Sequence, residues 1–226
     1  MDDATPADEA PEAASRLDRR KARTRAALVH AAQGFLAAGT VNVPIAEITE
    51  AADVGMGSFY NHFETKEELF RAAVEDALEA FGARLDELSA GVDDPAAAFA
   101  QSFRLCGRLH RRHPELSQVL LHHGLALVRS ERGLTPRTRR DIEAGVRAGR
   151  FHVGDPELAL AVVTGAALGL AGLLLTRPDR DDAEATDQVA EALLRLLGLP
   201  APEARTLCRR PLPDLEGAAG AARPAV

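Results

Sequence analysis

Residues 45–69, IAEITEAADVGMGSFYNHFETKEEL, decide the fold of this chain. Their first apolar residues, Ile45, Ile48 and Ala52, are spaced three and four apart, which predicts a short helix over about 44–52 with one buried face. Asp53-Val54-Gly55 interrupts this spacing, and glycine there permits the backbone angles of a sharp corner. We therefore expect a turn, followed by a second short helix over about 56–63.

The second helix of this stretch is expected to have one apolar side and one polar side. Phe59 and Phe63 fall on one side, whereas Tyr60 and Asn61 fall largely on the other. The polar side carries hydrogen-bonding groups without acids, which suits a surface that faces phosphate. A helix-turn-helix places its second helix in the major groove, where side chains reach base edges.

The same residues resemble the DNA-binding module of the TetR family of bacterial transcriptional regulators, over residues 24–72. The family pattern has Ile-Ala, a small-residue turn, Gly-x-x-Tyr-x-x-Phe and Lys-Glu-x-Leu. Here these segments are Ile45-Ala46, 51–55, 57–63 and 66–69. Three positions depart from the pattern: Gly55 replaces Ser or Thr, Asp53 replaces Gly, and Val43 replaces a residue that is often polar. The resemblance implies an all-helical homodimer that binds DNA and usually releases it when a small ligand binds.

The composition fits a helical protein of a reducing compartment. The chain has 226 residues, 46% of them hydrophobic, with no Trp and one Tyr, and abundant Ala and Leu favour helices over sheets. Its two Cys residues give no metal spacing and no disulfide framework. The acidic amino terminus does not read as a signal peptide, so we expect a cytoplasmic protein.

The charge distribution is uneven along the chain. The net charge is −7, which alone would disfavour DNA binding. However, residues 2–12 carry acids and no base, whereas residues 16–25 carry six bases and one acid, Asp18. A local basic stripe matters more to phosphate than the global sum, although a solvated helix start explains it equally well when it is considered alone.

The chain is expected to be all-α, with about nine helices in two domains. An acidic disordered tail (1–15) precedes the helix-turn-helix domain (16–65). A larger helical domain for ligand binding and dimerisation (66–200) follows, and then a weakly structured tail (201–226). Asn42 is a candidate N-cap for the first helix of the motif. Thr65 and Glu68 form a capping box for a long helix over 66–89, which connects the two domains.

The candidate DNA contacts lie on the motif and on the helix before it. Tyr60 and Lys66 are the strongest phosphate candidates, and the family uses the matching positions in this way. Asn61 can pair with adenine. The full set is Lys21, Arg25, Asn42, Met56, Gly57, Ser58, Tyr60, Asn61, His62 and Lys66.

The candidate ligand contacts lie on two predicted helices of the larger domain, where the family binds its ligands. An apolar cavity with a few polar groups is what a ligand site requires. The set is Phe99, Phe103, Cys106, His110, Leu120, His123 and Leu127. A solid core with a hydrogen-bonded histidine is an equally good interpretation. A histidine metal site and a redox role for Cys106 are weaker alternatives, so we expect no metal and no cofactor.

The last two long helices are the expected dimer interface. Residues 158–175 carry no charge, which reaches the length of a membrane span, but a helix apolar all round can also be buried against a partner. In the family these helices form a four-helix interface between subunits. The interface candidates are Gly165, Gly169, Gly172, Val189, Leu193 and Leu196.

The sequence therefore predicts a dimeric, sequence-specific DNA-binding regulator. We expect a repressor that a small, largely apolar ligand releases from an inverted-repeat operator. No nucleophile elbow, phosphate-binding loop or paired zinc motif indicates an enzyme. The alternatives are a helical dimer that binds a protein partner without ligand control and, with no motif to support it, an enzyme.

Overall fold

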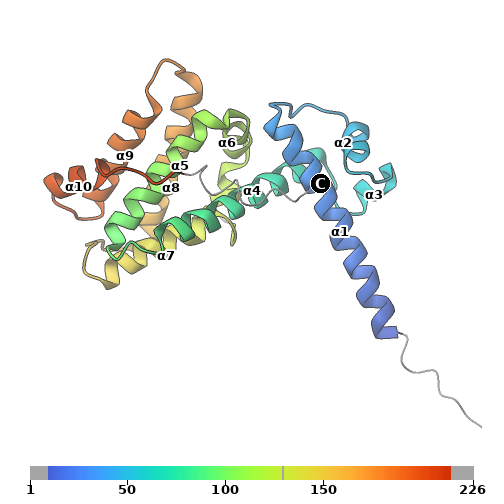
Figure 1. Ribbon diagram of the computed structural model, residues 1–226, viewed down its shortest axis with the longest axis horizontal. Coiled ribbons are helices and arrows are strands. Elements are labelled where there is room, and N and C mark those ends of the chain that lie inside the picture. Colours follow the sequence, from blue (N-terminus) through green and yellow to red (C-terminus); the bar gives the residue numbers. More distant parts are fainter. Residues whose placement is uncertain (1–9, 129, 215–226) are drawn as a thin grey trace, which may run out of the picture. The chain divides into compact units, whose positions relative to one another are not determined.

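The computed structural model describes residues 10–128 and 130–214, and within this range the side chains of residues 10–15, 123 and 125–128 are not described. The described residues form ten helices and no strand (Figure 1). The helices are α1 (Ala10–Ala37), α2 (Ile45–Ala51), α3 (Met56–Tyr60), α4 (Lys66–Ser89), α5 (Pro95–Arg112), α6 (Pro114–Val128), α7 (Leu134–Arg147), α8 (Pro156–Thr176), α9 (Asp182–Leu196) and α10 (Ala201–Cys208). The expected all-α fold is confirmed.

The chain divides into two compact units, Met1–Ala73 and Val74–Val226, and the boundary falls inside α4. In the first unit, α2 packs against α1 and α3. Leu28 of α1, Ile48 of α2 and Phe59 of α3 are fully buried. These apolar residues recur at helical spacing in the sequence, so burial of one face of each helix is what stabilises the module.

The corner between α2 and α3 is made by Asp53. Its φ is +52°, in the left-handed region, whereas Gly55 has a φ of −69° and is the N-cap of α3. The expectation that Gly55 supplies the unusual backbone angles is therefore wrong. A short polar side chain tolerates this region better than other L-residues do, so Asp53 can stand where the family usually has glycine.

Replacing Asp53 with Ile should destabilise the first unit. A β-branched residue at positive φ costs about 1–2 kcal/mol, and the Asp53 side chain is exposed, so no buried contact is lost. Urea unfolding of Asp53→Ile and of Asp53→Asn would measure the difference. Asn tolerates the same backbone angles and should leave stability nearly unchanged; equal stabilities of the two variants would contradict this prediction.

Of the two helix caps predicted around the motif, the one at α2 is wrong and the one at α4 is present in part. Asn42 does not cap α2, because the N-cap is Pro44 and no side chain bonds to the helix start. At the start of α4 the Thr65 half of the capping box is confirmed: Thr65 Oγ1 accepts a hydrogen bond from the Glu68 amide at 3.1 Å, whereas the reciprocal bond to the amide of Thr65 is replaced by one to its neighbour. The Glu68 carboxylate accepts a bond from the Glu64 amide at 2.8 Å.

The second unit is built around α5, which packs against α6, α7, α8, α9 and α10. Aspartates cap three of its helices: Asp94 caps α5, Asp155 caps α8 and Asp181 caps α9. Each carboxylate accepts hydrogen bonds from amides of the first turn, which have no partner within the helix. These aspartates thus specify where three helices of the second unit begin.

Two ends of the chain are more helical than predicted. Helix α1 begins at Ala10, inside the segment 1–15 that we expected to be disordered; the remainder of that segment lies outside the described residues. Residues 201–208 form α10 instead of a weakly structured tail, and Ala204, Leu207 and Cys208 bury one face of it. This three-and-four spacing is the signal for α10 that the prediction missed.

Candidate functional site

The polar surface of α3 is exposed as the sequence predicts. Phe59 and Phe63 are buried, whereas Tyr60 is 61% and Met56 49% exposed. Gly57 and Asn61 are also exposed, and Ser58 and His62 are half-buried. The helix therefore holds its apolar side against the module and presents the candidate DNA contacts outward.

Lys66 and Asn42 lie together in the first unit. The Lys66 ammonium donates a hydrogen bond of 3.2 Å to Asn42 Oδ1, so Asn42 positions the lysine at the start of α4. On α1, the Arg25 guanidinium lies 5.2 Å from the centre of the Phe63 ring, and Lys21 is exposed. Both candidate residues of α1 are on the surface of the same module.

A cavity of about 120 Å³ lies within the second unit. Helices α4, α5, α6, α7 and α8 all contribute to its walls, and the apolar part includes Leu78, Leu85 and Leu168. Of the predicted ligand contacts, Phe99, Phe103, Cys106 and Leu120 line it. The rings of Phe99 and Phe103 are nearly parallel with their centres 6.3 Å apart, so two neighbouring phenyl rings form part of the wall.

One predicted ligand contact whose side chain is described, His110, does not line this cavity. His110 is buried elsewhere, with Nδ1 2.9 Å from Ser117 Oγ, and burial lowers the pKa of its imidazole to about 4. It is a neutral core histidine, because burial disfavours its charged form, and Ser117 supplies its hydrogen-bond partner. The side chains of His123 and Leu127 lie outside the described residues.

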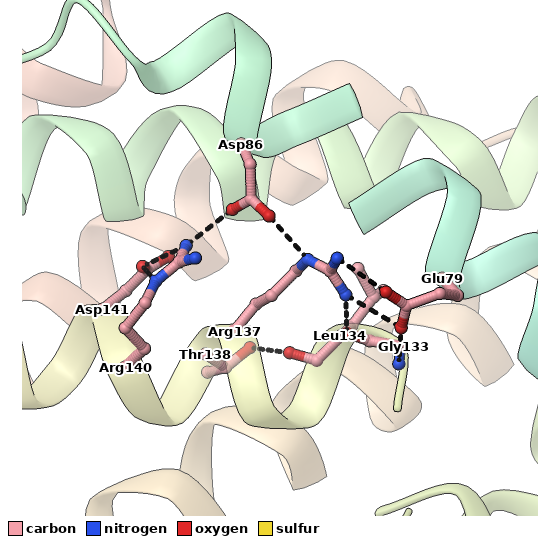
Figure 2. Close-up of polar contacts among 8 residues, drawn as sticks. All are labelled: Glu79, Asp86, Gly133, Leu134, Arg137, Thr138, Arg140 and Asp141. Atoms are coloured by element: carbon pink, nitrogen blue, oxygen red, sulfur yellow. Dashed lines mark hydrogen bonds and ion pairs between the residues drawn. The ribbon is translucent and has the colours of Figure 1, made fainter. Parts of the chain in front are cut away.

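Arg137 of α7 forms the strongest polar contacts at the cavity wall (Figure 2). Its guanidinium donates to both oxygens of Glu79, at 2.8 and 3.1 Å, and to Asp86 Oδ2 at 2.9 Å. Glu79 and Asp86 are both on α4. Between them a Cβ at Gly82 would lie 2.7 Å from Arg137, so glycine is what lets the arginine lie across α4 and reach both acids.

A second arginine extends this cluster. Arg140 donates to Asp86 Oδ1 at 2.7 Å and to Asp141 Oδ1 at 2.9 Å. Burial raises the pKa of Asp141, although Arg140 opposes the effect. For Asp86, burial acts in the same upward direction, but the hydrogen bonds of Arg140 and Arg137 outweigh it and lower its pKa. Asp141 is therefore the acid of the cluster that is most easily protonated.

The sequence prediction missed these charged residues because it took ligand candidates from α5 and α6 alone. A signal was present: Glu79 and Asp86 are seven residues apart on α4, which places them on one helical face. Arg137, Arg140 and Asp141 are three and four apart on α7. Two helices with complementary charges at such spacing indicate an ion-pair cluster.

Cys106 is a poor candidate for redox chemistry. Its side chain lines the cavity, and burial, followed by the charge of Asp141, raises the pKa of its thiol to about 12. The reactive thiolate is therefore scarce at neutral pH. Within the described part of the chain, no group of three or more His, Cys, Asp or Glu side chains could hold a metal ion.

Glu79→Gln should reduce stability at neutral pH and lose this effect in acid. The hydrogen bonds of Arg137 and of the Gly133 amide lower the pKa of Glu79 from 4.5 to about 2. Its ionised form therefore stabilises the protein above pH 4.5, and this contribution disappears as the pH falls towards 2. Because Glu79 is partly exposed, we expect about 1 kcal/mol or less at pH 7.

Urea unfolding of the variant and the wild type, measured from pH 7 down to pH 3, would test this pH dependence. Glu87→Gln is the matched control, since Glu87 is a more exposed α4 acid whose ion pair, among the described residues, is with Arg84. If the free energies of unfolding of Glu79→Gln and the wild type differed by the same amount at every pH, the stabilising role of ionised Glu79 would be contradicted.

An exposed apolar face, made of large side chains with two glycines between them, runs along α8. Leu158 is 66%, Val162 45% and Leu173 39% exposed. Gly165 and Gly169 lie between them, also exposed, with no atom within 4 Å of the position of a Cβ at either residue. By length and composition α8 could cross a membrane, with a mean hydropathy of 2.3, but its other side packs against α5, α6, α7 and α9.

The other interface candidates differ in exposure. Leu196 of α9 is 49% exposed, and Gly172 and Val189 are half-buried. Leu193 is buried in the core of the second unit, so its side chain is not exposed for an interface and its assignment to one is wrong. The period of α9 does not by itself tell an inward face from an outward one, which is why the sequence misplaced Leu193.

A helix-turn-helix unit joined to a helical unit with an internal cavity is the architecture of many transcriptional regulators, and the family comparisons agree with this class. Residues 27–73 match the family model of bacterial regulatory proteins of the tetR family. Residues 94–210 match the tetracyclin repressor-like C-terminal domain. The chain belongs to the TetR family of bacterial transcriptional regulators, as the sequence resemblance implied, and it is a regulator and not an enzyme.

Solved structures agree with this assignment. RolR (NCGL1110) in complex with the ligand resorcinol is 35% identical over 88% of this chain and 99% of its own, with a TM-score of 0.68. RolR without ligand is 36% identical over 84% of this chain and 99% of its own, with a TM-score of 0.71. FadR from Bacillus subtilis, in complex with stearoyl-CoA, shares the fold at 17% identity, over 74% of this chain and 96% of its own, with a TM-score of 0.58. Comparison with curated proteins gave no match.

Proposed function

We propose that this protein is a cytoplasmic, homodimeric repressor that leaves an inverted-repeat operator when a small hydroxylated aromatic molecule binds in the cavity. The observation that carries the proposal is the cavity itself, with apolar walls and an ion-pair cluster at one side. TetR-family regulators bind DNA and small ligands and are typically dimers.

The size and chemistry of the cavity support a one-ring ligand. A cavity of about 120 Å³ is similar to an engineered apolar cavity of about 150 Å³ that binds benzene. Phe99 and Phe103 offer an aromatic wall, while Ser102, Arg137 and Asp141 offer hydrogen-bonding groups. A hydroxylated ring matches both features, and the complex of RolR contains resorcinol.

The exposed face of α8 supports the dimer. Its large apolar side chains would face water in a single subunit, and its glycines would let a second helix approach closely. A twofold dimer carries two copies of α3 and would read a pseudo-palindromic site. Without a DNA-binding dimer, the protein would instead be the partner-binding module considered above.

Selection of DNA from a random pool on the full-length protein, followed by addition of resorcinol, would test this function. We expect an enriched inverted repeat, bound specifically at low salt and released by resorcinol but not by benzene, which lacks the hydroxyl groups. Failure to enrich any sequence would overturn the DNA-binding part. A specific complex that neither resorcinol nor phenol releases would overturn the ligand class alone.

Lys66→Ala should weaken operator binding and reduce its dependence on salt. Each phosphate contact releases counterions, so losing one lowers the slope of log affinity against log salt by about one per subunit. Fluorescence anisotropy between low and physiological salt would measure the slope. Lys66→Arg keeps the charge and should keep the slope; an unchanged slope in Lys66→Ala would show that Lys66 does not contact phosphate.

A further inference from the structure

The amino-terminal half of α1 carries a cluster of arginines that no other part of the fold uses. Arg19, Arg20 and Arg23 are exposed, and among the described residues no carboxylate lies within ion-pair distance of them. By contrast, Arg84, Arg137 and Arg150 of the second unit all face carboxylates. The cluster precedes the family match, which begins at residue 27.

The helix directs these arginines away from the rest of its unit. Successive residues turn by about 100° around an α-helix, so Arg19, Arg20 and Arg23 fall within an arc of about 100°. This arc is opposite to the face formed by Leu28, Val29, Ala32 and Leu36, which is buried against the module. The amino-terminal half of α1 projects beyond α2 and α3 (Figure 1).

We infer that this arm, residues 16–25, extends the DNA-contacting surface beyond Lys21 and Arg25, because its Arg19, Arg20 and Arg23 bind backbone phosphates beside the sequence contacted by α3. The inference rests on the proposed function, since the arm belongs to the same compact unit as the helix-turn-helix. Guanidinium groups match phosphate geometry and need no base sequence. Among the described side chains of the arm, Leu17 is the single large apolar one, which disfavours a protein groove as its partner.

The length of the arm sets how far the contact extends. Arg19 precedes the first buried residue of α1, Leu28, by nine residues, or about 14 Å along the helix. This corresponds to about four base pairs at 3.4 Å each. The protein should therefore protect about four more base pairs on each flank of its operator than the helix-turn-helix alone would cover.

The test compares two duplexes of one operator, selected from random DNA with the full-length protein. The short duplex contains the inverted repeat alone, and the long duplex has about ten more base pairs, one helical turn, on each side. The variant is Arg19→Gln/Arg20→Gln/Arg23→Gln, because Gln is nearly as good a helix former as Arg. Arg180→Gln/Arg195→Gln/Arg209→Gln is the matched control, since these three residues are also exposed and their loss changes the net charge equally.

The wild type and the control should bind the long duplex more tightly and with a steeper salt dependence than the short one. The α1 variant should bind both duplexes alike, with a salt slope on the long duplex lower by about three per subunit, from about 0.9 for each lost contact. Its footprint should shorten by about four base pairs per flank. The proposal is overturned if the α1 variant and the control behave alike, or if the wild type does not distinguish the duplexes. Absence of any specific wild-type complex would instead overturn the proposed function.

Discussion

Gly169→Leu should lower operator affinity by about 100-fold or more, with unchanged folding of the subunit. Gly169 lies on the exposed face of α8, and no atom lies within 4 Å of the position of its Cβ, so leucine fits in a single subunit. Leucine is also a better helix former than glycine, by up to about 1 kcal/mol. Between two closely packed helices, however, the added side chain would separate the subunits. Joining two DNA-binding modules raises affinity by about 10² to 10⁴, and this gain would be lost.

Analytical ultracentrifugation would measure subunit association, and anisotropy with operator DNA would measure binding. Gly34→Leu is the matched control, because Gly34 is likewise exposed in a helix with open space around it. It should leave association unchanged. A wild-type chain that is monomeric at micromolar concentration, or a Gly169→Leu protein that dimerises like the wild type, would contradict the proposed interface.

Cys106→Trp should abolish release by resorcinol while preserving operator binding. The Cys106 side chain lines the cavity, and an indole there would fill the space that a single-ring ligand needs. Ligand can shift the DNA-binding equilibrium only through its difference in affinity for the two states. Without binding, that difference is zero, so resorcinol should have no effect at any concentration that releases the wild type.

Calorimetry with resorcinol and anisotropy with operator DNA would separate the two activities. Cys106→Ala keeps the cavity open and should respond to resorcinol within a few-fold of the wild type. An unchanged response in Cys106→Trp would place the ligand elsewhere. Loss of response in Cys106→Ala would give the thiol a direct role in holding the ligand, as a protonated S–H group because burial raises its pKa.

The first unit could be predicted closely from the sequence because local signals determine it. The spacing of Ile48, Phe59 and Phe63 identifies the buried faces, and the Thr65–Glu68 capping box fixes the start of α4. The corner was assigned to the wrong residue because glycine is the usual source of positive φ, whereas here Asp53 adopts it. The interruption of the apolar spacing locates the turn, but it does not identify which residue of the turn adopts a positive φ.

The cavity was harder to predict because it depends on contacts distant in sequence. The apolar spacing of α5 correctly indicated Phe99, Phe103 and Cys106. It also indicated His110, which shares that spacing but bonds to Ser117 instead. The cluster around Arg137 joins residues more than 50 positions apart. Helical periodicity places each set of charges on one face of its own helix, but it does not say which two helices pair. Leu193 of α9 was likewise misassigned, because helical spacing does not say which face of a helix is buried.

The position of Arg137 has a practical consequence for engineering a biosensor from this protein. Arg137 is both a wall of the cavity and the group that lies across α4 at Gly82. A library that randomises every wall residue would therefore mix altered recognition with altered helix packing. Glu79, Gly82, Asp86 and Arg137 should stay fixed, and diversity belongs on the α5 and α8 walls, at Ser102, Thr164 and Leu168. New ligands can then be sought while the packing between α4 and α7 stays unchanged.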